Sequence, residues 1–330
     1  MSISHAINAA QSGLKVSGLR ADIVATNVAN ASTPGYVRRS VLLGETLVGG
    51  RTSGVTATGV TRSADAALTA ERRTLSSDVA QASLMSSTWQ VLSSRLGDDA
   101  EGTGLFSKFS KFEAALSASV TSPESGTQLA ALLDSANAVV TELNSLSKLV
   151  SQQRSEADRE IADGVKVVNK ALKQIEELNG LLVGVDGSTS QAAALMDERQ
   201  RTLDTIAEYL PIEVVPREGG AIDIITVEGV YLVAGKAKQL DFSPANSFGA
   251  DMTLDNGALS GLTIDGQNLT PGASSYAAVS SGMFGALFTL RDTDLPAFGA
   301  QLDTIANDLV TRLSNDSIDP TKTPGDFGLF

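Results

Sequence analysis

The chain has 330 residues, and its 25 Lys and Arg residues against 38 Asp and Glu residues give a net charge of −13. So acidic a chain lacks the basic face that binds the phosphates of nucleic acid or an anionic membrane surface, and we expect neither partner. With no cysteine and one histidine, His5, the chain excludes disulfides, thiol catalysis and metal sites built from Cys or several His residues, and we expect no cofactor.

The apolar residues are mainly small and aliphatic, because 42% of the chain is hydrophobic but only 5% is aromatic. Such side chains suit long helices that pack side by side. The sequence contains no run of 18 apolar residues that would predict a membrane-spanning helix. The first twenty residues lack the basic and apolar regions of a cleaved signal peptide. We therefore expect the chain to stay in the cytosol or to leave by a route without a cleaved signal.

Residues 3–28 carry an apolar stripe with the 3- and 4-residue spacing of a helix that lies against other helices. The first 60 residues hold too few other apolar side chains to cover this stripe, so we expect its partners to come from elsewhere. The stripe comprises Ile3, Ile7, Ala10, Leu14, Ala21, Val24 and Val28.

A different pattern follows in residues 30–63. The Pro34-Gly35 dipeptide predicts a turn, and further glycines separate short β-branched runs such as residues 55–58. We expect extended chain and a hairpin of short strands in this region.

Helical spacing returns at residues 64–96 and again at residues 105–120. The predicted helix at 64–96 is defined by apolar positions that lie three, four or seven residues apart. They are Leu68, Leu75, Val79, Ala82, Trp89, Leu92 and Leu96.

The longest helical pattern begins after Ser122-Pro123-Glu124, which has the residue order of a helix start. It continues to about residue 182, too long for one compact globule to surround. Its apolar seam is formed by Leu129, Leu132, Ala136, Val139, Leu143, Leu146, Val150, Ala157, Ile161, Val165, Val168, Leu172, Ile175 and Leu178.

A glycine-rich turn at 183–190 and a helix at 191–209 follow, and Pro211 ends that helix. We therefore predict a fold that is mainly α with a smaller β part. In it, long antiparallel, coiled-coil-like helices form an elongated rod beside a short β-meander.

Short strands are expected between about residues 211 and 290, because turn sequences separate β-branched runs there. One more helix is expected at 295–313. Together these patterns divide the chain into an N-terminal segment at 1–60, a helical rod domain at 61–314 that includes the meander, and a tail at 315–330 that looks like the start of a further segment.

No constellation of catalytic residues is present, so we do not expect an enzyme. The Walker A, dinucleotide-binding, zinc-protease and serine-hydrolase motifs are all missing from the sequence. We interpret His5 as a polar residue on the flank of the first helix. The Asp197-Glu198-Arg199 sequence is expected to make local ion pairs of small energy.

The sequence Ala29-Asn30-Ala31-Ser32-Thr33-Pro34-Gly35-Tyr36 resembles the signature of flagellar axial proteins, which form the rod, the hook and the hook-associated structures. The resemblance rests on residue type, spacing and position after the first helix. It implies an assembly interface made of the first helix and the following turn, with Ile3, Ile7, Leu14, Val24, Val28, Asn30, Thr33, Pro34, Gly35 and Tyr36.

A second stretch, residues 195–204 followed by the strand at 212–215, is similar to the corresponding helix and strand of the hook–filament junction family, flagellar hook-associated protein 1. Gln200 stands where that family usually has Asp. Family members also continue into inserted outer domains and a C-terminal helix, so the resemblance implies a chain truncated before both.

The resemblance implies a structural, self-assembling protein that forms a ring between hook and filament in the bacterial flagellum. Its expected partners are other copies of itself, the hook protein, a second hook–filament junction protein and an export chaperone. Export through the flagellar type III channel would place it outside the cell, as a secreted protein.

Three alternatives remain. The nearest is another flagellar axial protein of the rod or hook. A coiled-coil signalling protein would share the helical seams but not the Thr33-Pro34-Gly35-Tyr36 sequence, and a flagellum-attached peptidoglycan hydrolase would need catalytic residues.

Overall fold

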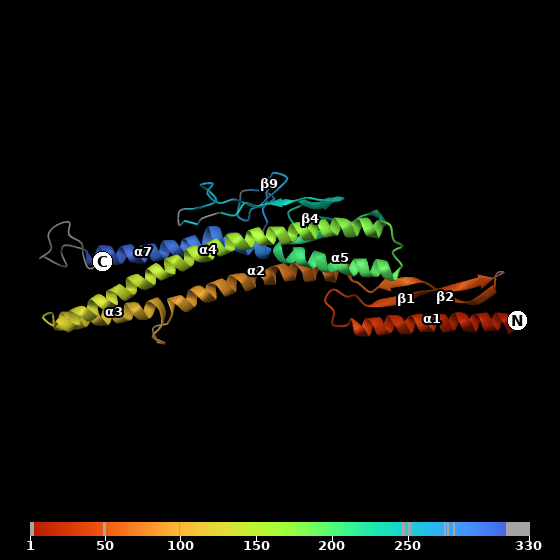
Figure 1. The fold of residues 1–330 in the computed structure, drawn as a ribbon, viewed down its shortest axis with the longest axis horizontal. Coiled ribbons are helices and arrows are strands. Elements are labelled where there is room, and N and C mark those ends of the chain that lie inside the picture. The colour runs from red at the N-terminus through yellow and green to blue at the C-terminus, as the bar shows by residue number, and fades with distance from the viewer. Residues whose placement is uncertain are drawn as a thin grey trace. The chain divides into compact units, whose positions relative to one another are not determined.

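The structure, a computed structural model, describes residues 3–48, 51–98, 100–245, 248–249, 252–273, 275, 277–279 and 281–314. The predicted start of a further segment at 315–330 lies outside these residues. The described chain is mainly helical with small antiparallel sheets (Figure 1). The predicted fold class, mainly α with a smaller β part, is therefore confirmed.

The helices are α1 (Ile3–Ala29), α2 (Ala66–Leu96), α3 (Gly104–Thr121), α4 (Gly126–Val183), α5 (Ser190–Tyr209), η1 (Glu218–Gly220), α6 (Gly282–Thr289), η2 (Leu290–Asp294) and α7 (Leu295–Leu313). The strands are β1 (Arg39–Val48), β2 (Arg51–Arg62), β3 (Ile212–Pro216), β4 (Ile222–Thr226), β5 (Tyr231–Ala234), β6 (Lys236–Ala237), β7 (Leu240–Asp241), β8 (Thr263–Ile264) and β9 (Gln267–Asn268).

The chain forms two compact units, and the long helices α2 and α4 contribute residues to both. The first unit contains residues 1–80, 164–241 and 262–283, and the second contains residues 81–163, 242–261 and 284–330.

In the first unit, α1 lies along the antiparallel hairpin of β1 and β2 (Figure 1, red and orange). Val16 and Ile23 are buried on the hairpin side of α1, and Val60 of β2 is buried as well. The strands are longer than the short strands that the glycine spacing predicted. The strand pairing continues past two register shifts instead of ending there. Bulges of this kind bend a strand without ending it.

Helix α4 runs without a break over 58 residues and passes through Gly164. Its predicted seam is confirmed from Ala136 to Leu178, since those positions are buried. The predicted start is wrong. Ser122 caps the end of α3, Pro123 and Glu124 form a turn, and the helix begins at Gly126. The three residues after α3 are used to reverse the chain, so they cannot also form the first helical turn.

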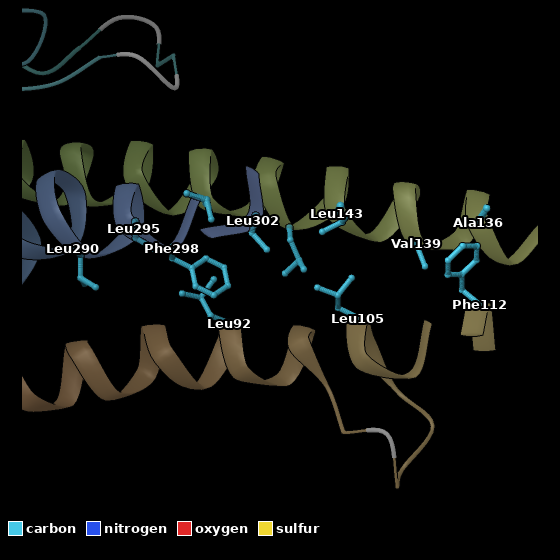
Figure 2. Close-up of a cluster of buried hydrophobic side chains, with 12 residues drawn as sticks. Leu92, Leu105, Phe112, Ala136, Val139, Leu143, Leu290, Leu295, Phe298 and Leu302 are labelled. Carbon is cyan, nitrogen blue, oxygen red and sulfur yellow. The ribbon is translucent and has the colours of Figure 1, made fainter. Parts of the chain in front are cut away.

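The core of the second unit lies where α2, α3, α4 and α7 pack together (Figure 2). Phe298 meets Trp89 in an edge-to-face contact, with ring centroids 6.2 Å apart. The buried cluster consists of Leu92, Leu105, Phe112, Ala136, Val139, Leu143, Leu146, Val150, Leu290, Leu295, Phe298 and Leu302.

In the first unit, two amide side chains of α4, the buried Asn179 and the partly buried Asn169, hold the small sheets against the helix. The Asn179 side chain donates to the backbone oxygen of Ile222 and accepts from its N–H, at 2.8 and 3.1 Å. Asn169 makes the same pair of bonds with Leu240, both at 2.8 Å. The strands follow a meander, in the order β3-β4-β5-β6 and then β7-β8-β9. Strands β3 and β4 form an antiparallel hairpin whose turn includes Gly219 at φ +70°.

The prediction of β structure up to about residue 290 is wrong for its last stretch, because α6 occupies Gly282–Thr289 and continues through the π-helical turn η2 into α7. The residues of α6 are apolar on nearly every side, and all but Met283 and Thr289 are buried. A short, uniformly apolar run has no periodicity that separates a strand from a buried helix.

None of the described helices combines the length and the apolar character that crossing a membrane requires.

The buried α4 seam gives a first prediction. Leu172→Ala should lower the free energy of unfolding by about 2–5 kcal/mol, because it leaves a cavity at a fully buried position. Leu14→Ala on α1 is the matched control, since that side chain is 76% exposed. Denaturant unfolding followed by circular dichroism measures both, and an equal loss in the two variants would contradict the assignment of the seam as core.

Candidate functional site

The apolar residues predicted for an interface lie on the face of α1 that points away from the hairpin. We call Ile3, Ile7, Leu14, Val24 and Val28 the α1 stripe, and all five are between 51% and 79% exposed. The opposite face of α1 packs on the strands through Val16 and Ile23. One face of the helix therefore packs on the hairpin, and none of the described residues covers the opposite, apolar face.

The other five predicted site residues, Asn30, Thr33, Pro34, Gly35 and Tyr36, come together in the turn that ends α1. Backbone hydrogen bonds run from Thr33 N to Asn30 O at 2.9 Å and from Tyr36 N to Thr33 O at 3.1 Å. Gly35 has φ +74°, a conformation that L side chains rarely adopt. A Cβ at Gly35 would also lie 2.5 Å from Cγ of Arg201 on α5. The turn thus passes directly over α5 and needs glycine there.

Asn27, which the sequence analysis did not single out, joins α1 to the first strand. Its amide group donates to the backbone oxygen of Arg39 at 2.8 Å. Its Oδ1 accepts from the N–H of Arg39 at 2.9 Å and from the Tyr36 hydroxyl at 2.7 Å. One side chain thereby fixes the start of β1 and the ring of Tyr36 relative to the helix.

Asp197 on α5 holds the two strands together at the open end of the hairpin, where β1 begins and β2 ends. Arg39 and Arg62 lie directly opposite each other in the strand register, an arrangement of like charges that destabilises a strand pair. The Asp197 carboxylate accepts from Arg39 Nη2 at 2.7 Å and from Arg62 Nε at 2.9 Å. Its side chain is only 4% exposed. The guanidinium of Arg39 also lies over the ring of Tyr36, 5.1 Å from its centroid.

The expectation that Asp197 makes local ion pairs is therefore wrong, because its partners lie 158 and 135 residues away along the chain. Glu198 does pair locally, with Arg201. The pairing of Arg39 with Arg62 could have indicated the role of Asp197, because a hairpin that places two arginines opposite each other needs an anion between them. We call Asn27, Tyr36, Arg39, Arg62 and Asp197 the hairpin clamp.

Two further polar contacts position α5 within the first unit. Arg199 donates to the backbone oxygen of Gly220 at 2.7 Å. Burial, and secondarily the nearby charge of Arg62, lowers the pKa of Arg199 to about 10, so the group is still protonated at neutral pH. Gln200 accepts from Arg73 at 3.2 Å and donates to Asp204 at 2.8 Å. An aspartate, which the resembled family usually has at this position, could accept but could not donate to Asp204.

The site combines an uncovered apolar helix face with a cluster of paired charges. Among the described residues, no group of three or more His, Cys, Asp or Glu side chains is placed to hold a metal ion. The carboxylates of Asp197 and Asp204 are each paired with arginines. The geometry therefore leaves one apolar face of α1 uncovered and fixes the direction of this helix.

Comparison with known proteins identifies two families within the chain. The helical domain of the flagellar hook-associated protein FlgK matches residues 90–317, and the flagella basal body rod protein family matches residues 7–36.

The curated relatives include two named flagellar hook-associated protein 1. The Salmonella typhimurium protein is 25% identical over 253 residues, which make up 74% of this chain and 45% of the relative. The protein of Escherichia coli strain K12 is 24% identical over 304 residues, 89% of this chain and 53% of the relative. The chain thus spans about half the length of these relatives.

A solved structure shares the fold. The flagellar hook junction protein FlgK from Burkholderia pseudomallei matches with a TM-score of 0.57 and 18% identity, over 75% of this chain and 43% of that one.

The turn after α1 provides the second prediction. Gly35→Val should open this turn, because valine is strained at φ +74° and its Cβ would displace Arg201. Limited proteolysis should then cut within residues 30–40 at lower protease concentration than in the unchanged protein.

Gly102→Val is the matched control, since Gly102 has φ +68° but no atom within 4 Å of the added Cβ. Adding Arg201→Ala to Gly35→Val should recover part of the protease resistance. Resistance of the turn equal to that of the unchanged protein would show that the packing over Arg201 does not hold it.

Proposed function

This chain belongs to the family of the flagellar hook-associated protein FlgK, and on that premise we propose that it is a structural component of the junction between flagellar hook and filament. The observation that carries the proposal is the α1 stripe, an apolar face left open while the hairpin clamp fixes its direction. A helix that cannot bury its apolar face within its own chain is suited to assembly with other chains.

We propose that the ten residues of the α1 stripe and the following turn form the assembly interface. Copies of this chain in a ring, the hook protein and a second hook–filament junction protein are its proposed neighbours in the flagellar axis. An export chaperone is the proposed partner before assembly, with secretion through the flagellar type III channel to the outside of the cell.

The role we propose is structural and involves no reaction. The matched relatives are flagellar proteins, which supports this role over the coiled-coil signalling protein and the peptidoglycan hydrolase. A rod or hook protein is the nearest alternative, and the match of the FlgK helical domain over residues 90–317 favours the junction.

The test of the proposed function is Ile7→Asp in the complete protein, expressed in a bacterium that lacks its own copy. The variant should fold and reach the medium, but filaments should be absent and swimming lost, because a carboxylate in an apolar interface opposes association. Asn8→Asp, the neighbouring exposed residue outside the stripe, is the control and should leave filaments intact. Normal swimming with Ile7→Asp would overturn the proposed interface.

A further inference from the structure

The second unit holds a group of charged side chains in its interior. Arg291, Asp158 and Arg154 are 0%, 2% and 3% exposed. Arg291 Nη1 donates to Asp158 Oδ1 at 2.6 Å, and Arg291 Nε and Nη2 donate to the two carboxylate oxygens of Asp292, both at 2.9 Å. We call Arg154, Asp158, Arg291 and Asp292 the Arg291 cluster. Its two cations and two anions balance, so the cluster carries no net charge.

The π-helical turn η2 supplies a backbone acceptor to this cluster. Within the turn, the N–H of Leu295 donates to the oxygen of Leu290, five residues back. Pro296 follows and has no N–H to donate. The carbonyl oxygen of Arg291 is thereby available to Arg154, whose Nε donates to it at 2.9 Å. The irregular turn and the buried arginines therefore depend on each other.

The Arg291 cluster also holds an irregular segment of the second unit. We call the described residues 242–245 and 252–261 the strap, and none of them belongs to a helix or a strand. Three backbone groups of the strap bond to charged side chains of the cluster. The bonded pairs are Ala245 N with Asp158 Oδ2 at 2.8 Å, Met252 O with Arg154 Nη2 at 2.6 Å, and Ser260 O with Arg291 Nη2 at 3.0 Å.

Apolar burial contributes little to holding the strap. Among the described residues of the strap, Leu259 alone is buried. Phe242 is partly buried and meets Phe288 of α6 edge-to-face, with ring centroids 6.0 Å apart. The guanidinium of Arg291 lies over both rings, 5.6 Å from the centroid of Phe242 and 4.7 Å from that of Phe288. The strap thus depends mainly on charged groups, whereas the helices depend on the apolar core of Figure 2.

Opening this strap costs less free energy than opening an apolar segment of the same length. Exposing apolar side chains loses hydrophobic free energy in proportion to their area. Exposing the Arg291 cluster breaks hydrogen bonds, but it also returns charged groups to water, and the recovered hydration offsets much of that loss. Segments with few buried apolar contacts open locally, at free energies below that of global unfolding.

We infer that the strap is a conformational device, which opens and closes as one segment while the helices of the second unit stay folded, and that the pairing of Arg291 with Asp158 sets how often it opens. The open state uncovers Asp158 and Phe288. The inference is independent of the proposed function, because it uses neither the α1 stripe nor the hairpin clamp. Failure of either one therefore leaves the other standing.

Thiol labelling of the purified, unassembled protein tests this device, since the chain has no cysteine of its own. Leu259→Cys places a thiol at a 4% exposed position of the strap, and Leu92→Cys places one at a 0% exposed position of the core. The strap thiol should react at a rate that low concentrations of denaturant do not change, because a local opening exposes little surface. The core thiol should react more slowly, and its rate should rise steeply with denaturant. Equal rates with the same denaturant dependence would overturn the inference, because the strap would then open only on global unfolding.

The role of the ion pair is read from Asp158→Asn in the Leu259→Cys protein. Asparagine keeps the shape of the side chain and loses its charge, so labelling of the strap thiol should accelerate roughly tenfold or more. That faster rate should still not change with low denaturant. Asp308→Asn is the matched control, since it breaks an exposed pair with Arg312 and should leave the labelling rate unchanged. Strap labelling as slow in Asp158→Asn as in its parent would contradict the role of the pair.

Replacing the ion pair by apolar side chains separates the device from a general contribution to stability. Asp158→Leu with Arg291→Met leaves no unpaired charge between these positions, so the melting temperature should stay the same or rise. The strap thiol should nevertheless react faster than in the parent, because Ala245 and Ser260 lose their charged partners. Labelling as slow as in the parent would overturn the inference, because apolar contacts would then hold the strap equally well.

Discussion

The buried carboxylate of Asp197 holds together two cations that would otherwise drive the N-terminal hairpin apart. Arg39 and Arg62 face each other across the strand pair, and both donate to Asp197. A two-stranded hairpin alone is marginal in water, so this one depends on its contact with α5. Helix α1 in turn lies on the hairpin through Val16 and Ile23. This ion cluster, together with the hydrogen bond from Val60 N to Ser188 O, therefore fixes the direction of the N-terminal segment.

The helix that carries Asp197 is itself rigidly placed within the first unit. Its residues Leu203 and Ile206 are buried, as is Leu172 on α4. Asn169 and Asn179 pin the small sheets to α4 by paired hydrogen bonds to single backbone residues. This support lets a chain keep apolar faces on α1 and α2 exposed without using them to fold. Such faces are the physical requirement for a subunit that is to be covered only by its neighbours.

The sequence predicts most of what depends on local spacing. The seam of α4 was predictable from Ala136 to Leu178, because burial of every third or fourth position is a property of the helix itself, but Leu129, predicted as part of the seam, is 44% exposed. The exposed α1 stripe was predictable because the surrounding 60 residues could not cover it. Helix α6 was not predictable, because its short apolar run has no period. Neither was the role of Asp197, since its two partners come from strands far away in the chain. The exposure of Leu68 and Leu75 also depends on a distant contact, the pairing of Arg72 with Asp204.

The claim that Asp197 supports the N-terminal segment is tested most directly by hydrogen exchange of the β1 and β2 amides in unassembled protein. Asp197→Asn leaves two unpaired cations, and breaking a buried ion pair costs about 3–5 kcal/mol, so exchange in the hairpin should accelerate roughly 100-fold or more. Exchange in the middle of α4 should not change. Adding Arg39→Gln and Arg62→Gln should restore part of the protection, because no uncompensated charge then remains. Hairpin amides as well protected in Asp197→Asn as in the unchanged protein would contradict the account.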